Sequence, residues 1–97
     1  MLTGKQKSYL RSLGQKMKPV FQVGKEGITQ AVFQSVYDYL FKNELCKINV
    51  LDTCPQTIAE VAHEFERRKI DVAQKIGKTL LLFLPNENLE DGIVLPE

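Results

Sequence analysis

The sequence contains no tryptophan, one histidine and only two cysteines among its 97 residues. The cysteines, Cys46 and Cys54, form no C-x-x-C pair and have no histidine close to them in the sequence. A zinc site would therefore lack ligands, and we expect two reduced thiols in or near the core. A disulfide is not expected in a cytosolic chain. No metal and no cofactor are predicted.

Long apolar runs are also absent. No segment approaches the roughly 20 consecutive apolar residues that a membrane helix needs. The N-terminal segment carries Lys5 and Lys7 with no apolar stretch behind them, which is not the pattern of a secretory signal. We therefore expect a cytoplasmic protein with no membrane partner. A chain of 97 residues that is 43% hydrophobic is long enough for one domain with its own core.

Motifs for common catalytic chemistry are missing. No serine lies in a Gly-x-Ser-x-Gly setting, and Gly77-Lys78-Thr79 matches only the end of a nucleotide-binding P-loop. His63 has no partnered group of the kind that general-base chemistry needs. Glu60 and Glu64 stand one helical turn apart without an accompanying metal-ligand histidine. We therefore predict that the protein is not an enzyme.

The net charge of +1 conceals an uneven distribution. The first 25 residues contain cations and no acidic residue, namely Lys5, Lys7, Arg11, Lys16, Lys18 and Lys25. Residues 85–97 contain acidic residues and no cation, namely Glu87, Glu90, Asp91 and Glu97. A basic patch of this kind indicates a polyanionic partner, although an ordinary solvated helix face would show the same composition.

Hydrophobic spacing predicts three helices and four strands. Thr3 and Gln6 form a capping-box pattern at the start of the first helix, and Gly14 is expected just past its end in a left-handed conformation. Thr29 is expected to cap the second helix, and Pro55 to lie near the first position of the third. The predicted helices cover residues 3–13, 28–43 and 55–69, and the predicted strands cover 20–23, 45–51, 70–76 and 79–84.

The resulting order is αβαβαββ. Because helices link the first three strands, these strands are expected to run parallel through right-handed crossovers, and the last two should form an antiparallel hairpin. The apolar run at 79–84 is expected in the middle of the sheet, covered on both faces. We predict a two-layer or three-layer α/β sandwich with a four-stranded mixed sheet over residues 1–85. An acidic, loosely held tail is expected over 86–97.

The segment Gly24-Lys25-Glu26-Gly27 lies between a predicted strand and a predicted helix N-terminus. Glycines let the backbone approach a ligand, free amides there can point at a phosphate, and the helix dipole favours an anion. Lys25 adds a mobile positive charge, while Glu26 opposes a phosphate locally. The same kind of loop clamps nucleotide backbones in K-homology RNA-binding domains. A plain strand-to-helix turn is the alternative interpretation.

Four blocks of the sequence resemble the CRM domain family, in particular its bacterial stand-alone, YhbY-like members. The blocks are Leu2–Lys7 with Leu10-Arg11, Lys18–Thr29, Glu44–Ile48 and Gln74–Leu80. The resemblance implies a fold similar to the C-terminal domain of translation initiation factor three, and RNA binding without catalysis. Bacterial members look like factors that associate with precursors of the large ribosomal subunit. One departure is Leu84, where family members often have arginine.

We therefore predict a monomeric RNA-binding protein whose partner is ribosomal RNA of large-subunit precursors, with no DNA expected. The N-terminal helix and the glycine loop should gather on one surface and contact phosphates, extended by two lysines of the last hairpin. The predicted RNA-binding residues are Lys5, Lys7, Arg11, Lys18, Gly24, Lys25, Gly27, Thr29, Lys75 and Lys78. Two alternatives stay open: a protein-binding translation or ribosome adaptor, and an α/β domain that binds a phosphorylated metabolite.

Overall fold

The predicted order of helices and strands is confirmed by the structure, a computed structural model that describes residues 2–86, 88–89 and 92–96. The helices are α1 (Gly4–Gly14), α2 (Gln30–Asn43) and α3 (Ile58–Arg67). The strands are β1 (Phe21–Val23), β2 (Leu45–Val50), β3 (Asp71–Ile76) and β4 (Thr79–Phe83). Within these described residues, no helix combines the length and the apolar character needed to cross a membrane.

Threonine caps begin all three helices. The Thr3 hydroxyl accepts a hydrogen bond from the Gln6 amide, and the Gln6 side chain accepts one from the Thr3 amide, so the predicted capping box is confirmed. The same reciprocal pair joins Thr57 and Glu60. The prediction that α3 starts near Pro55 is therefore wrong, because Thr57 caps the helix and Pro55 lies in the loop before it.

Gly14 has a packing role that its sequence position did not predict. It is the last residue of α1 and is followed by Gln15 in a right-handed conformation, so the expected left-handed glycine cap is wrong. A Cβ on Gly14 would lie 2.7 Å from Leu81 Cδ2, so glycine lets the helix end approach the sheet closely. The Lys47 ammonium on β2 completes this helix end by donating to the carbonyls of Gly14 (3.1 Å) and Met17 (3.3 Å).

The four strands form one mixed sheet in the order β1-β2-β4-β3. β1 pairs parallel with β2, whereas β4 pairs antiparallel with both β2 and β3. The first three strands therefore point in the same direction, as predicted, and β3 and β4 form the predicted hairpin around Gly77, whose φ is 56°. Central strand β4 is buried on both faces, as its continuous apolar run indicated.

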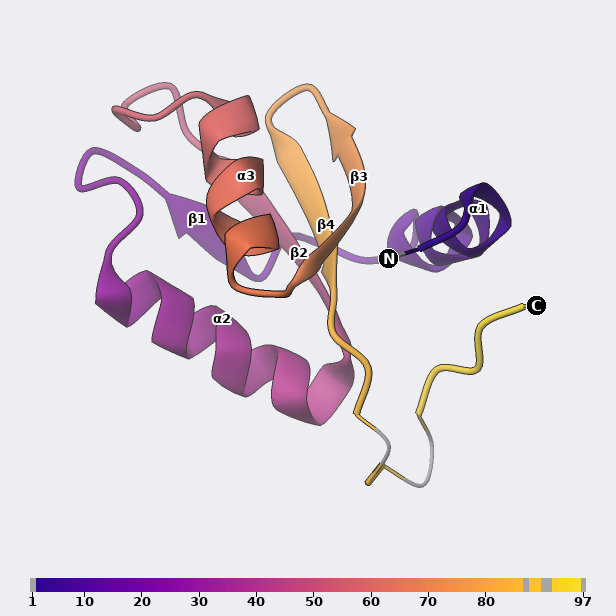
Figure 1. The fold of residues 1–97 in the computed structure, drawn as a ribbon. Coiled ribbons are helices and arrows are strands. Elements are labelled where there is room, and N and C mark those ends of the chain that lie inside the picture. The colour runs from indigo at the N-terminus through magenta and orange to yellow at the C-terminus, as the bar shows by residue number, and fades with distance from the viewer. Residues whose placement is uncertain (1, 87, 90–91, 97) are drawn as a thin grey trace.

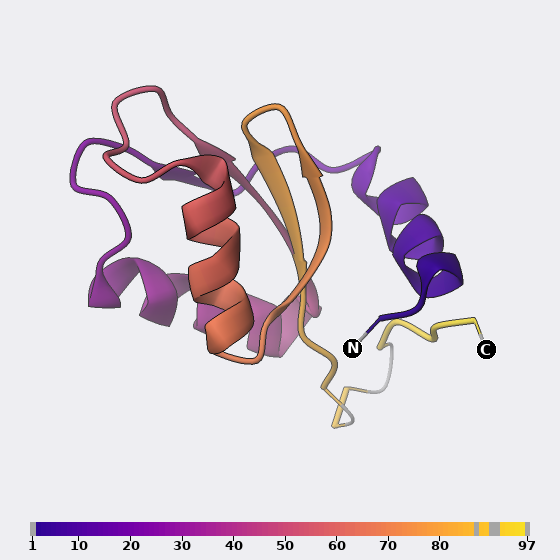
Figure 2. The same cartoon turned by 45° about the horizontal axis from the view of Figure 1, so that its top comes forward.

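Helices cover both faces of the sheet, so the sandwich has three layers. Figures 1 and 2 show α1 on one side of the sheet and α2 with α3 on the other. Alternate residues of β4 serve the two cores: Leu80 and Leu82 pack with α2 and α3, whereas Leu81 and Phe83 pack with Leu10 of α1. This arrangement separates the N-terminal helix from the elements that carry the glycine loop.

Buried Glu44 connects the C-terminal segment to the domain. It follows α2 in a left-handed conformation with a φ of 64° and is only 3% exposed. Its carboxylate accepts hydrogen bonds from the Asn86 amide (2.7 Å) and the Ile93 amide (2.6 Å). Ile93 and Leu95 then pack against the core on the α1 side. The loose attachment of the tail stays a prediction, and its acidic residues, Glu87, Glu90, Asp91 and Glu97, lie outside the described residues.

Candidate nucleic-acid interface

The glycine loop is a tight turn between β1 and α2. The Gly27 amide donates to the Gly24 carbonyl over 2.9 Å. Gly27 is buried with a φ of 70°, and a Cβ there would overlap the Gln56 side-chain oxygen. Gly24 has ordinary space around it, since its nearest neighbour, Leu51 Cδ1, would lie 3.6 Å from an added Cβ. The positive φ and the close contact therefore favour glycine at Gly27 and not at Gly24.

Hydrogen bonds hold the loop where it joins α2, whereas the tip of the loop is exposed. The Ile28 amide donates to the Gln56 side-chain oxygen over 3.3 Å, and the Thr29 hydroxyl accepts from the Val32 amide over 3.2 Å as it caps α2. Lys25 and Glu26 are exposed. Their two amides have no hydrogen-bond partner within the described part of the chain. The tip thus presents free donors and one cation, and it lines a cavity together with Thr29 and Val32 at the start of α2, which is an arrangement suited to an anion.

Two other loops lie at the same end of the strands as the glycine loop, because the C-terminal ends of β1, β2 and β3 all lie there (Figure 1). The loop after β2 contributes Asp52, which forms an ion pair with Lys78 in the turn between β3 and β4. The Val50 amide also donates to the Lys78 carbonyl over 2.7 Å. Lys78, one of the predicted site residues, therefore lies at this end of the strands, and Asp52 partly offsets its charge.

A second group of cations lies between α1 and β3. Lys7 and Arg11 line a cavity of about 450 Å³ together with Lys75 of β3 and Glu66 of α3. Lys7, Arg11 and Lys75 are all exposed. The cavity brings Lys75, which was predicted only as an extension of the site, into the same surface as the basic helix. We call Lys7, Arg11 and Lys75 the basic groove.

The glycine loop and the basic groove lie at two ends of the molecule. Both views show the loop after β1 on the opposite side from α1 (Figures 1 and 2). The reason is the strand order: the loop follows edge strand β1, whereas α1 contacts the other edge strand, β3. Three strand spacings of about 4.8 Å separate these edges. The prediction that helix and loop gather on one surface is therefore wrong.

The remaining predicted cations lie outside both groups. Lys5 is exposed in the first turn of α1, and Lys18 is exposed on the segment that joins α1 to β1. Neither lines the basic groove or the cavity at the glycine loop. Lys18 lies on the segment that connects α1 to β1, so a positive side chain is present between the two groups.

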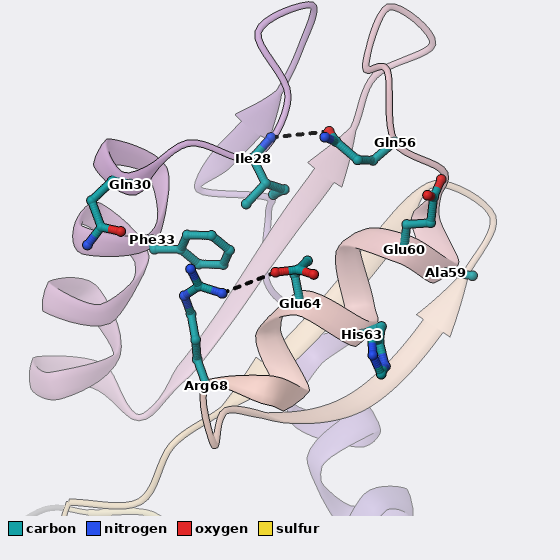
Figure 3. Close-up of a pocket in the computed structure, with 9 residues that line it drawn as sticks. All are labelled: Ile28, Gln30, Phe33, Gln56, Ala59, Glu60, His63, Glu64 and Arg68. Atoms are coloured by element: carbon teal, nitrogen blue, oxygen red, sulfur yellow. Dashed lines mark hydrogen bonds and ion pairs between the residues drawn. The ribbon is translucent and has the colours of Figure 1, made fainter.

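Sequence reasoning missed a groove of about 650 Å³ between α2 and α3 (Figure 3). Among its lining residues, the Arg68 guanidinium carbon lies 3.5 Å from the centre of the Phe33 ring. Arg68 also forms an ion pair with Glu64 over 3.2 Å. The hydrogen bond from Arg67 is the main influence that lowers the pKa of Glu64, so this carboxylate stays charged. No local sequence pattern links Phe33 with Arg68, because only the tertiary fold brings them together.

The groove also contains the polar residues that sequence analysis had considered for catalysis. Glu60, His63 and Glu64 all line it. Among the described residues, no group of three or more histidine, cysteine, aspartate or glutamate side chains could hold a metal ion.

The two cysteines are free, with Cys46 buried and Cys54 partly buried, as the sequence predicted. Burial raises the pKa of the Cys46 thiol to about 12.

Comparison with known proteins gives consistent matches over nearly the whole chain. The family model of the CRS1 / YhbY (CRM) domain matches residues 2–83. "Probable RNA-binding protein YqeI" of Bacillus subtilis is 37% identical over 84 residues, which cover 86% of this chain and 88% of that protein. A Haemophilus influenzae protein named "RNA-binding protein" is 32% identical over 96 residues, covering 98% of this chain and 95% of that protein.

A solved structure supports the fold directly. The solution structure of the hypothetical protein SAV1595 from Staphylococcus aureus superposes with a TM-score of 0.79 at 37% sequence identity. The match covers 99% of this chain and 100% of that protein. The likeness therefore extends through all seven helices and strands and both faces of the sheet.

Proposed function

Because the chain belongs to the CRS1 / YhbY (CRM) domain family, we propose that it is a non-catalytic RNA-binding protein that holds the RNA backbone at the glycine loop. The relatives named as RNA-binding proteins support the partner. The observation that carries the mechanism is the tip of the loop, where Lys25 and Glu26 have free amides and line one cavity with Thr29 and Val32 at the start of α2. The exposed Lys25 side chain adds a full positive charge.

The loop suits a phosphate for electrostatic reasons. Backbone amides at a helix N-terminus donate to an anion, and the helix dipole adds about half a positive charge there. The fixed geometry of Gly27 and its neighbours lowers the entropy lost when a phosphate binds. The exposed Glu26 carboxylate weakens the attraction locally, so Lys25 carries the greater part of the favourable charge.

The basic groove supplies a second set of phosphate contacts. Lys7, Arg11 and Lys75 converge there, and Glu66 is the acidic residue that shares the cavity. This groove and the loop lie at two ends of the molecule. A bound RNA must therefore extend from the β1 side of the sheet to the β3 side to contact both. A long structured RNA meets this requirement better than a mononucleotide does. We propose that this RNA is ribosomal RNA of large-subunit precursors, as the resemblance to bacterial CRM proteins implies, and that the protein binds it as a monomer in the cytoplasm.

Titration of structured ribosomal RNA at several salt concentrations tests this proposal. Each phosphate contact should contribute about −0.7 to −0.9 to the slope of log affinity against log salt. Contacts at both ends predict a slope several times that value. Efficient competition by a free nucleotide would instead indicate a metabolite site, and recruitment that requires a ribosomal protein would indicate an adaptor.

Gradient co-sedimentation of cell lysate tests the ribosomal part of the proposal separately. The protein should travel with large-subunit precursors and leave them when the salt concentration is raised. Sedimentation with mature ribosomes alone, or with neither, would contradict the assembly role while leaving RNA binding itself in place.

A further inference from the structure

The α2–α3 groove begins directly beside the glycine loop. Gln56 contacts the loop and lines the groove. Its side-chain oxygen accepts a hydrogen bond from the Ile28 amide, where the loop ends, and its side chain forms part of the groove lining. Figure 3 shows this hydrogen bond at one end of the groove and the Arg68–Phe33 contact farther along it. A nucleotide whose phosphate lies at the loop would therefore have its neighbouring base close to the groove.

The charges of the groove disfavour a phosphate and favour an uncharged group. Glu60 and Glu64 both line it, and Arg68 is already paired with Glu64. A phosphate entering the groove would meet these two carboxylates with no uncompensated cation among the lining residues. A nucleobase carries no charge, and its amino groups are donors that carboxylate and amide oxygens accept. The loop and the groove thus differ in which part of a nucleotide they can bind.

Arg68 provides a planar surface for stacking. One side of its guanidinium lies over the Phe33 ring, and Phe33 in turn packs edge-on against Phe65 with ring centres 5.2 Å apart. Phe33 is only 7% exposed, so the ring is a fixed support. The Arg68 side chain is 40% exposed, which leaves part of it accessible from the groove. Arginine planes held in this way are stacking partners for unpaired RNA bases.

We propose that the α2–α3 groove is a nucleobase site, in which an unpaired base stacks on Arg68 while the adjoining backbone is held at the glycine loop. This inference rests on the proposed RNA-binding function and adds a requirement to it: at least one base of the bound RNA must be unpaired. The base lies between the α2 and α3 faces, and Gln30, Gln56, Glu60 and Glu64 surround it with polar groups.

The test uses base removal, which needs no change in the protein. A single-stranded oligoadenylate is compared with versions in which one base at a time is replaced by an abasic ribose, so that the backbone charge is unchanged. Removal of the base that occupies the groove should weaken wild-type binding about fivefold or more, the lower end of the per-base stacking energies.

Arg68→Lys and Arg67→Lys form a matched pair of variants. Both arginines lie at the end of α3 and pair with Glu64, but only Arg68 contacts Phe33 and lines the groove. Arg68→Lys keeps the charge and loses the plane. It should bind the intact oligoadenylate about fivefold more weakly and become insensitive to base removal. Arg67→Lys should behave as the wild type in both respects.

The outcomes separate this inference from the proposed function. Equal wild-type affinity for intact and abasic RNA would overturn the nucleobase site, even where Lys25→Glu still weakens binding. Base sensitivity that survives in Arg68→Lys would likewise overturn it. No wild-type binding to intact oligoadenylate would contradict the nucleobase site, whereas no binding to structured ribosomal RNA would contradict the proposed function.

Discussion

The side-chain oxygen of Gln56 occupies the space that any side chain at Gly27 would need. We therefore expect Gly27→Ala to lower the free energy of unfolding by about 1–3 kcal/mol, because the positive φ and the overlap act together. Gly24→Ala is the matched control. Its φ is not positive and an added Cβ would make only ordinary contacts, so a change within about 0.5 kcal/mol is expected. Urea denaturation measures both, and equal effects would contradict the distinction.

Neutralising the basic groove should change the salt dependence of RNA binding. Lys7→Gln combined with Arg11→Gln removes two of the cations that converge beside β3. The slope of log affinity against log salt should become shallower by about 1.4–1.8, corresponding to two lost phosphate contacts. Lys42→Gln, at the far end of α2, should leave the slope unchanged. An unaltered slope in the double variant would remove α1 from the interface.

Glu44 should hold the C-terminal segment in place. Glu44→Ala removes the acceptor of the Asn86 and Ile93 amides. The unfolding free energy should fall by about 1–3 kcal/mol, because two partly buried donors lose their partner. Hydrogen exchange of those two amides should become faster. Glu44→Gln keeps one carbonyl oxygen and should show a smaller effect, and unchanged exchange in both variants would contradict the anchoring role.

The two cysteines should differ in reactivity. Cys54 is partly exposed and should react with a thiol reagent in the folded protein, whereas buried Cys46 should react only after unfolding. The raised pKa of Cys46 also sets a pH dependence. Between the pKa of an unfolded cysteine, about 8.5, and the folded value of about 12, only the unfolded state releases the proton. Stability should therefore fall as pH rises through this range.

A Cys54→Ser variant checks the assignment of these thiols. It should show no fast-reacting thiol in the folded state and keep the alkaline loss of stability. Rapid modification of this variant under native conditions would show that Cys46 is accessible.

Local sequence signals predicted most of the fold. The Thr3–Gln6 capping box, the apolar run in β4 and the threonine ahead of α2 each act through neighbouring residues, so they are visible in the sequence. The start of α3 differs from the prediction because the capping pair Thr57 and Glu60 begins the helix, whereas Pro55, two residues before Thr57, does not. The Thr57-x-x-Glu60 pattern is itself visible in the sequence.

Features that depend on tertiary packing were not predictable in this way. Gly14 looked like a helix-terminating glycine, but its role depends on Leu81 of β4. The contact between Phe33 and Arg68 likewise joins two helices that the sequence does not pair. The separation of the glycine loop from α1 follows from the strand order, which the sequence pattern left open. The site residues were therefore predicted one by one, whereas their grouping required the fold.

Phosphate binding at the loop tip is tested most directly by Lys25→Glu against Lys42→Glu in titrations with structured ribosomal RNA. Both substitutions change the net charge equally, but only Lys25 lies in the glycine loop, while Lys42 lies in the last turn of α2. Lys25→Glu should weaken RNA affinity about tenfold or more, with the midpoint of unfolding nearly unchanged, and Lys42→Glu should have little effect. Equal affinities of the two variants would contradict phosphate contact at the loop.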